Sequence, residues 1–111
     1  MQTLALTVPD LVSEVGAALT AEGHAALVPQ LASASIECYT YDEEADAGYI
    51  YLVRPAPSQN FANLATPVAE TIAFFGENGF TVDVDHDGHL FGIELLSRPD
   101  VIAKLKESNA L

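Results

Sequence analysis

The feature that most constrains this sequence is the dipeptide Asp87-Gly88, which stands between two stretches of alternating residues. Asp-Gly is typical of the two-residue turn of a β-hairpin. A hairpin built on this turn separates an apolar face from a polar one, and a shift of one residue would destroy that separation. The apolar pairs are Val84 with Phe91, Val82 with Ile93 and Phe80 with Leu95. The opposite face holds Asp85 with Leu90, Asp83 with Gly92 and Thr81 with Glu94, and His86 faces His89 beside the turn.

The same segment also matches the pattern of a calcium-binding loop. Residues 83–94 carry acids at the first, third and fifth positions, glycine at the sixth and glutamate at the twelfth. An EF-hand needs a helix directly before the loop, whereas residues 76–82 contain two glycines and then alternate as a strand does. The hairpin accounts for every position and the calcium loop for only some, so we expect a β-turn.

A weaker metal hypothesis stays open beside the hairpin. Asp83, Asp85 and Glu94 share its polar face, and carboxylate oxygens suit a hard cation. A second acidic turn carries Asp42, Glu44 and Asp46. The alternative, which we expect, is that these are solvated charges whose turn aspartates bond to nearby backbone amides.

Outside the hairpin, helical spacing of apolar residues covers the first third of the chain. Thr7 and Asp10 resemble a capping box around Pro9, and the helix that they open is expected to end at Gly23. A second short helix is expected over 24–32, although Pro29 weakens it. Alternating residues then predict strands over 36–41, 49–54 and 68–75, with a loop over 54–67 and a turn at 76–79.

These elements predict an α+β fold with an antiparallel sheet of about five strands. We expect one domain over 1–111, made of a helical segment over 1–35, the sheet over 36–97 and a short C-terminal helix over 98–111. Ser97 or Asp100 opens that last helix.

Two segments of the sheet region carry distinctive motifs. They read YDEEADAGYIYL over 41–52 and VDVDHDGHLFGIELL over 82–96. Together they resemble the signatures YDxExDAxYI and DxDxxGxxxGIExL of a small bacterial domain family of unknown function, over roughly residues 36–97. The resemblance implies no established activity and no catalytic residues. Some members resemble partners in toxin–antitoxin-like gene pairs, which implies an antitoxin-like role as one candidate.

The charge of the chain limits its partners. Sixteen acidic residues oppose four basic ones, for a net charge of -12, and only Arg54 precedes the basic residues of the last segment, Arg98, Lys104 and Lys106. Nucleic acid and anionic membranes need a basic patch, so we expect neither as a partner. A basic protein or a cation is the complementary choice. The first residues lack the pattern of a signal peptide and no apolar run reaches the ~20 residues of a membrane span, so we expect a cytoplasmic protein.

Side chains for catalysis are sparse. We expect no catalytic residue and no cofactor, because the chain lacks a nucleophile elbow, a phosphate-binding glycine loop and a dinucleotide motif. Cys38 is expected to be an inert buried thiol in a strand. His86 and His89 are expected to close the end of the hairpin, and the four tyrosines to pack with their hydroxyls at the rim.

The best functional hypothesis is an acidic, non-enzymatic protein-interaction module. Leu90 and Leu96 fall on the polar face of the hairpin, where a second copy of the chain could cover them, so we expect a homodimer. The alternative is a metal-binding protein or metal-dependent hydrolase that uses Asp83, Asp85 and Glu94.

Overall fold

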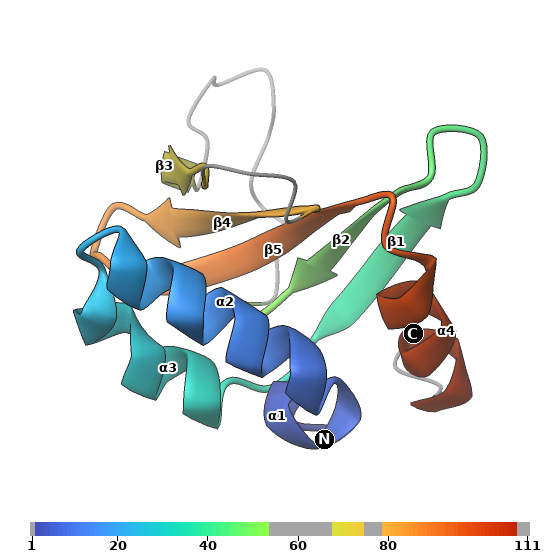
Figure 1. The fold of residues 1–111 in the computed structure, drawn as a ribbon, viewed down its shortest axis with the longest axis horizontal. Helices are drawn as coiled ribbons and strands as arrows, with labels where there is room; N and C mark the ends of the chain where they lie inside the picture. Colours follow the sequence, from blue (N-terminus) through green and yellow to red (C-terminus); the bar gives the residue numbers. More distant parts are fainter. Residues whose placement is uncertain (1, 54–67, 75–78, 109–111) are drawn as a thin grey trace.

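Helices cover one face of an antiparallel sheet in the computed structural model, which describes residues 2–53, 68–74 and 79–108 (Figure 1). Three α-helices precede the sheet and one follows it, so the expected α+β class is confirmed. They are α1 (Leu4–Thr7), α2 (Pro9–Ala21), α3 (Val28–Ser33) and α4 (Pro99–Ser108). The five strands are β1 (Cys38–Asp42), β2 (Ala47–Tyr51), β3 (Val68–Ile72), β4 (Phe80–Asp85) and β5 (Leu90–Leu96).

The first helix begins differently from the prediction. Thr7 ends α1, and Val8 precedes α2 without any side-chain cap, so the expected capping box of Thr7 and Asp10 is wrong. The cap belongs instead to Thr3, whose hydroxyl oxygen accepts the Leu6 amide at 3.3 Å and so supports an additional helical turn. Pro9 lies in the first turn of α2, where its missing amide costs nothing.

The second predicted helix accommodates its proline in the same way. A 3-10 turn (Ala25–Leu27) leads into α3, and Pro29 falls in the first turn of that helix. Gly23 separates the two helices with a φ of +84°, a conformation that favours glycine. The two helices predicted for the first third of the chain are therefore confirmed.

The sheet has the strand order β1-β2-β5-β4-β3, so the strand latest in sequence lies at its centre. The predicted strands over 36–41 and 49–54 correspond to β1 and β2, which begin and end within a few residues of the expected positions. The predicted strand over 68–75 is confirmed as β3 up to Ile72. The predicted loop over 54–67 and most of the turn at 76–79 lie outside the described residues.

The register of β4 and β5 is confirmed away from the turn and wrong beside it. Phe80 pairs with Leu95 and Val82 with Ile93, as predicted. At the turn end, Val84 pairs with Leu90 in place of Phe91, because the register shifts between Asp83 and Val84.

The cause of the shift is a longer turn. The Asp85 amide donates to the His89 carbonyl at 2.9 Å, and the Gly88 amide donates to the Asp85 carbonyl at 3.1 Å. The loop therefore has three residues, with Gly88 in the left-handed conformation at a φ of +79°. The Asp85 carboxylate supports it by accepting the amides of Asp87 and His89, each at 2.9 Å. His86 and His89 consequently do not form the expected cross-strand pair.

This shift places two consecutive large residues on opposite faces of β5. Leu90 lies in the core, 5% exposed, so its expected place on the polar face is wrong. Phe91 is also buried, but on the other face, where its ring meets Tyr51 edge-on with centroids 6.1 Å apart.

The core fills the space between the sheet and the helices. Ile50, Val82 and Ile93 from the sheet are fully buried against apolar residues of the helices. The helical members are Leu4, Leu11, Val15, Leu19, Leu31, Val101, Ile102 and Leu105. A Cβ at Gly48 would lie 2.9 Å from Ile102 Cδ1, so this glycine lets α4 pack closely against β2.

Candidate functional site

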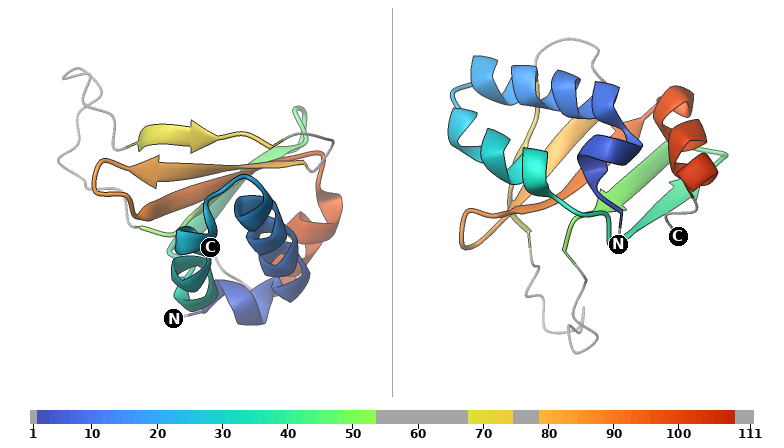
Figure 2. Two further views of the ribbon diagram at one scale, coloured as in Figure 1. Left: turned by 60° about the vertical axis from the view of Figure 1, so that its left-hand side comes forward. Right: turned by 90° about the horizontal axis from the view of Figure 1, so that it is seen from below.

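The face of the sheet opposite the helices is the first candidate surface, and we call it the open face. All of the described helices lie on the other side of the sheet in both views of Figure 2. Cross-strand partners share a face, and the open face therefore holds Cys38, Thr40, Asp42, Ala47, Tyr49, Tyr51, Thr71, Thr81, Asp83, Phe91, Gly92, Glu94 and Leu96. Among these residues, the only ionisable groups that carry charge near neutral pH are carboxylates.

Aromatic rings form a row across the middle of the open face. The centroids of Tyr49 and Tyr51 lie 4.7 Å apart, and Tyr51 then meets Phe91. The Tyr49 ring extends over Gly92, where a Cβ would lie only 2.3 Å from Tyr49 Cε1. Gly92 is therefore the position that lets the tyrosine lie flat against β5.

A hydrogen-bond network fixes the tyrosine at the other end of its side chain. The Tyr49 hydroxyl donates to Asp83 Oδ2 at 2.6 Å, and the Thr71 hydroxyl donates to Asp83 Oδ1 at 2.6 Å. Burial raises the pKa of the Tyr49 phenol, and its hydrogen bond to Asp83 raises that pKa further. The network links β2, β4 and β3, which no local sequence pattern could indicate.

The three metal candidates from the hairpin, Asp83, Asp85 and Glu94, have different surroundings and different hydrogen-bond partners in the structure. Both oxygens of Asp83 accept hydroxyl bonds, and Glu94 pairs across the sheet with Tyr49 and Thr81. Asp85 lies in the turn, where bonds from backbone amides, first that of His89, lower its pKa.

A different group of potential ligands meets at the turn. Within the described part of the chain, Asp85, Asp87 and His89 place ligand atoms within 4.8 Å of one another. His89 Nδ1 lies 3.9 Å from Asp85 Oδ2. Asp83 and Glu94 do not belong to this group.

The acidic turn between β1 and β2 is arranged by its own backbone. Asp42 Oδ1 accepts the Glu44 amide at 3.0 Å, and Asp46 Oδ1 accepts the Tyr41 hydroxyl at 3.0 Å. That hydroxyl bond raises the pKa of Tyr41. Asp46 adopts a φ of +49°, which aspartate tolerates better than most residues.

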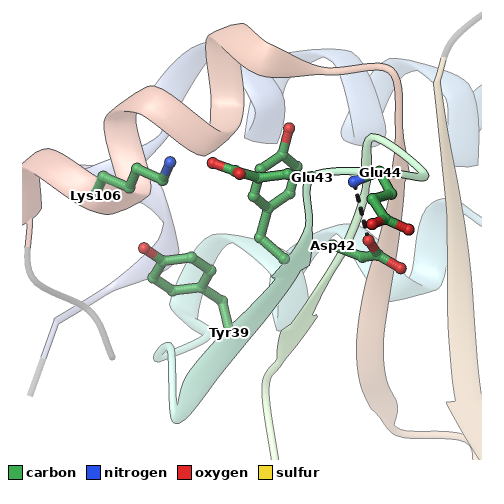
Figure 3. Close-up of a pocket in the computed structure, with 6 residues that line it drawn as sticks. Tyr39, Asp42, Glu43, Glu44 and Lys106 are labelled. Carbon is green, nitrogen blue, oxygen red and sulfur yellow. Dashed lines mark hydrogen bonds between the residues drawn. The ribbon is translucent and has the colours of Figure 1, made fainter.

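A hollow of about 640 Å³ lies beside this turn, between the outer strand and α4 (Figure 3). Its lining residues are Tyr39, Tyr41, Asp42, Glu43, Glu44 and Lys106. The Lys106 ammonium lies 5.2 Å from the centroid of the Tyr41 ring, in the position of a cation–π contact. Sequence reasoning missed the hollow, because Lys106 is 65 residues or so from the strand that it approaches.

Cys38 differs from its prediction. Its side chain is half-buried in the outer strand β1, not enclosed in the core.

The four tyrosines lie on both faces of the sheet: Tyr39 is buried toward the helices and Tyr49 lies on the open face. No helix within the described ranges is long and apolar enough to cross a membrane.

Comparison with known proteins gives a family and no function. No curated protein and no solved structure matches the chain. One family model, described as a protein of unknown function (DUF2283), matches residues 39–97. That match spans more than half of the 111 residues and nearly all of the range expected from the two motifs. The chain therefore belongs to the DUF2283 family of proteins of unknown function.

Proposed function

We propose that the protein is a non-enzymatic interaction module that binds a basic segment of a protein partner on its open face. The observation that carries the proposal is the pair of half-buried rings of Tyr49 and Tyr51, which lies against the buried Phe91 ring, is flanked by carboxylates and is not covered by any described helix. Aromatic residues are enriched at protein interfaces because they bring a large contact area at little conformational cost.

Charge complementarity selects the kind of partner. Asp83 and Glu94 lie among the rings, and the basic residues that the structure describes, Arg98, Lys104 and Lys106, all lie in or next to α4. A basic segment would gain attraction over the whole approach to this face. An antitoxin-like role would be one instance of such binding, with a basic toxin as the partner.

Self-association through the open face is the competing form of this proposal. Leu96 is 45% exposed there, and the two-fold pairing of identical faces could cover it. The two occupants respond to salt in opposite ways. Screening weakens the attraction of a basic partner but relieves the repulsion between two acidic copies.

Affinity capture with matched baits tests the proposal. The wild-type chain, Tyr51→Ala and Leu6→Ala are immobilised and exposed to an extract of the source cells at low and high salt. Leu6 is 85% exposed on α1 and serves as the control, because it is an apolar side chain on the other side of the molecule. We expect a basic protein that is retained by the wild type and by Leu6→Ala, but lost from Tyr51→Ala and at high salt. Equal retention on all three baits would refute binding through the open face.

Sedimentation equilibrium addresses the competing occupant. If the open face pairs with itself, the chain forms a dimer whose association strengthens with salt and disappears in Tyr51→Ala. If the chain is a monomer at about 100 micromolar in both low and high salt, self-association through the open face is refuted and binding of a different partner remains.

Within the residues that the structure describes, one geometric feature favours the metal alternative from the sequence, namely the meeting of Asp85, Asp87 and His89. Of the three residues that the hypothesis named, only Asp85 belongs to that group. Calcium or magnesium binding is therefore a rival to the protein-binding proposal, and the change of Tm in the presence of either ion tests it.

A further inference from the structure

The backbone of β2 shows which of its residues face each neighbouring strand. The Leu52 amide donates to the Phe91 carbonyl at 3.0 Å, and the Ser97 amide donates to the Asp46 carbonyl at 2.8 Å. Along a strand with an antiparallel neighbour on each side, successive residues direct their backbone hydrogen bonds to the two neighbours in turn. The even-numbered residues of β2 therefore form their backbone hydrogen bonds with β5. The odd-numbered residues of β2 therefore bond toward β1.

This alternation leaves the outer strand with groups that point away from the sheet. Cys38, Thr40 and Asp42 are the partners of the odd-numbered residues of β2, so their backbone groups point inward. The amides and carbonyls of Tyr39 and Tyr41 point outward, and β1 has no further strand beside it in the described sheet. The edge offers these groups to an added strand.

The side chains of the same two residues line the hollow. Tyr41 is half-buried beside it, the largely buried Tyr39 contributes only a small exposed part, Glu43 and Glu44 contribute exposed carboxylates, and Lys106 enters it from α4 (Figure 3). A strand added beside β1 would direct the side chains next to Tyr39 and Tyr41 toward the hollow, because residues at the same level of a sheet share a face.

We propose that an extended, arginine-containing segment of a basic partner docks along β1 as an added strand and places an arginine side chain in the hollow. The inference rests on the proposed function, and it narrows the partner to a strand-forming, arginine-bearing segment. Backbone bonds to Tyr39 and Tyr41 would supply affinity, and the hollow would supply the choice of side chain.

The lining of the hollow suits a guanidinium group. A planar cation stacks on tyrosine rings and can bond two carboxylate oxygens at once. Lys106 already holds a cation 5.2 Å from the Tyr41 ring centroid, so the hollow accepts this chemistry within the chain itself. A second copy of the chain is disfavoured as the occupant, because it would bring its own Asp42, Glu43 and Glu44 against the same carboxylates.

Amide hydrogen exchange tests the added strand. The probe is a synthetic peptide of alternating arginine and threonine, mixed with the full chain and followed by nuclear magnetic resonance. We expect the amides of Tyr39 and Tyr41 to exchange rapidly in the free protein and about tenfold or more slowly with the peptide. If the peptide shifts the Tyr49 and Tyr51 signals but leaves these two amides unprotected, docking at the edge is overturned and binding on the open face stands. If the peptide does not bind, docking at the edge is overturned as well, and the capture experiment decides the proposed function on its own.

Charge variants test the hollow. The double variant Glu43→Gln, Glu44→Gln should weaken peptide binding by about two- to fivefold for each carboxylate removed. Asp10→Asn with Glu22→Gln removes the same charge from the two ends of α2 and should leave the affinity nearly unchanged. Lys106→Met removes the competing cation and should tighten binding. Equal weakening in the two double variants would overturn the role of the hollow. Its role would also be overturned if neither Lys106→Met nor the variant of Glu43 and Glu44 changed the affinity for the peptide.

Discussion

The two faces of the sheet are built from the same strands and are ordered by different forces. On the helix-covered face, Ile50, Val82 and Ile93 are fully buried among apolar side chains. On the open face, Tyr49 is positioned by a glycine beneath its ring and by a carboxylate at its hydroxyl. One face is held by excluding water and the other by specific contacts between half-exposed groups. The difference teaches that alternate residues of one strand can be held in place by different forces.

The largest effect is expected from a charge on the helix-covered face. Val82→Asp would bury an unpaired carboxylate and should lower the free energy of unfolding by on the order of 3 kcal/mol or more. Thr40→Asp, at an exposed position of the open face, should cost about 1 kcal/mol or less. Urea denaturation measures both, and equal losses would break the distinction between the faces.

A methyl group under Tyr49 should have the next largest effect. In Gly92→Ala the new Cβ would lie 2.3 Å from the Tyr49 ring, which must then move and give up its bond to Asp83. We expect a loss of about 2 kcal/mol. In a Tyr49→Ala background the same substitution should cost less than about 1 kcal/mol, because the clash is gone. Additive losses in this double-mutant cycle would contradict the contact.

The ionisation of Tyr49 gives a smaller effect that is confined to alkaline pH. Burial and the bond to Asp83 raise the pKa of its phenol in the folded state above the unfolded value of about 10. The resulting stability is fully present below pH about 10 and is lost as the pH rises further. At pH about 11 the wild type should therefore have lost about 1 kcal/mol more than Tyr49→Phe does over the same range. Denaturation curves at several pH values measure this difference. If the two proteins lose the same free energy of unfolding, the pKa of the Tyr49 phenol is not raised by folding.

The smallest effect, which we expect to be absent, concerns metal ions. An ion stabilises a fold only through preferential binding to it, and the aspartates of the turn already accept backbone amides. Millimolar calcium or magnesium should therefore change Tm by less than about 1 °C. A rise of several degrees that Glu94→Gln abolishes would restore the calcium loop. A rise that is lost in Asp87→Asn or His89→Gln would assign an ion to the group at the turn.

Periodicity predicted β2 and β4 well because buried and partly buried residues alternate along each of them. The alternation from Phe80 to Asp83 fixed the correct partners on β5, since a slip would have exposed Val82. It failed at Leu90 and Phe91, where both side chains are buried on opposite faces. The reason is the Asp85 carboxylate, which stabilises a longer turn by a side-chain contact that a pattern of apolar residues does not contain.

The candidate surfaces were less predictable than the fold. The acids of the open face were identified from the hairpin, but the contact of Tyr49 with Asp83 depends on how two distant hairpins join. The hollow depends on where α4 packs against the sheet. The sequence predicts a helix at the end of the chain, but it does not predict the position in which that helix packs. The capping box failed for a local reason, because Thr3 offered a competing cap before Thr7.

The central place of β5 has a consequence for how the chain acquires its fold during synthesis. A chain that emerges from its N-terminus presents β1 with β2, and later β3 with β4, before Leu90–Leu96 exists to join them. An isolated two-stranded hairpin is marginally stable at best, so neither pair is expected to persist alone. Their union also requires a contact between strands far apart in sequence, which is slow to form. The nascent chain should therefore stay exposed to chaperones and proteases until β5 is made, and then gain its whole sheet in one late, cooperative step.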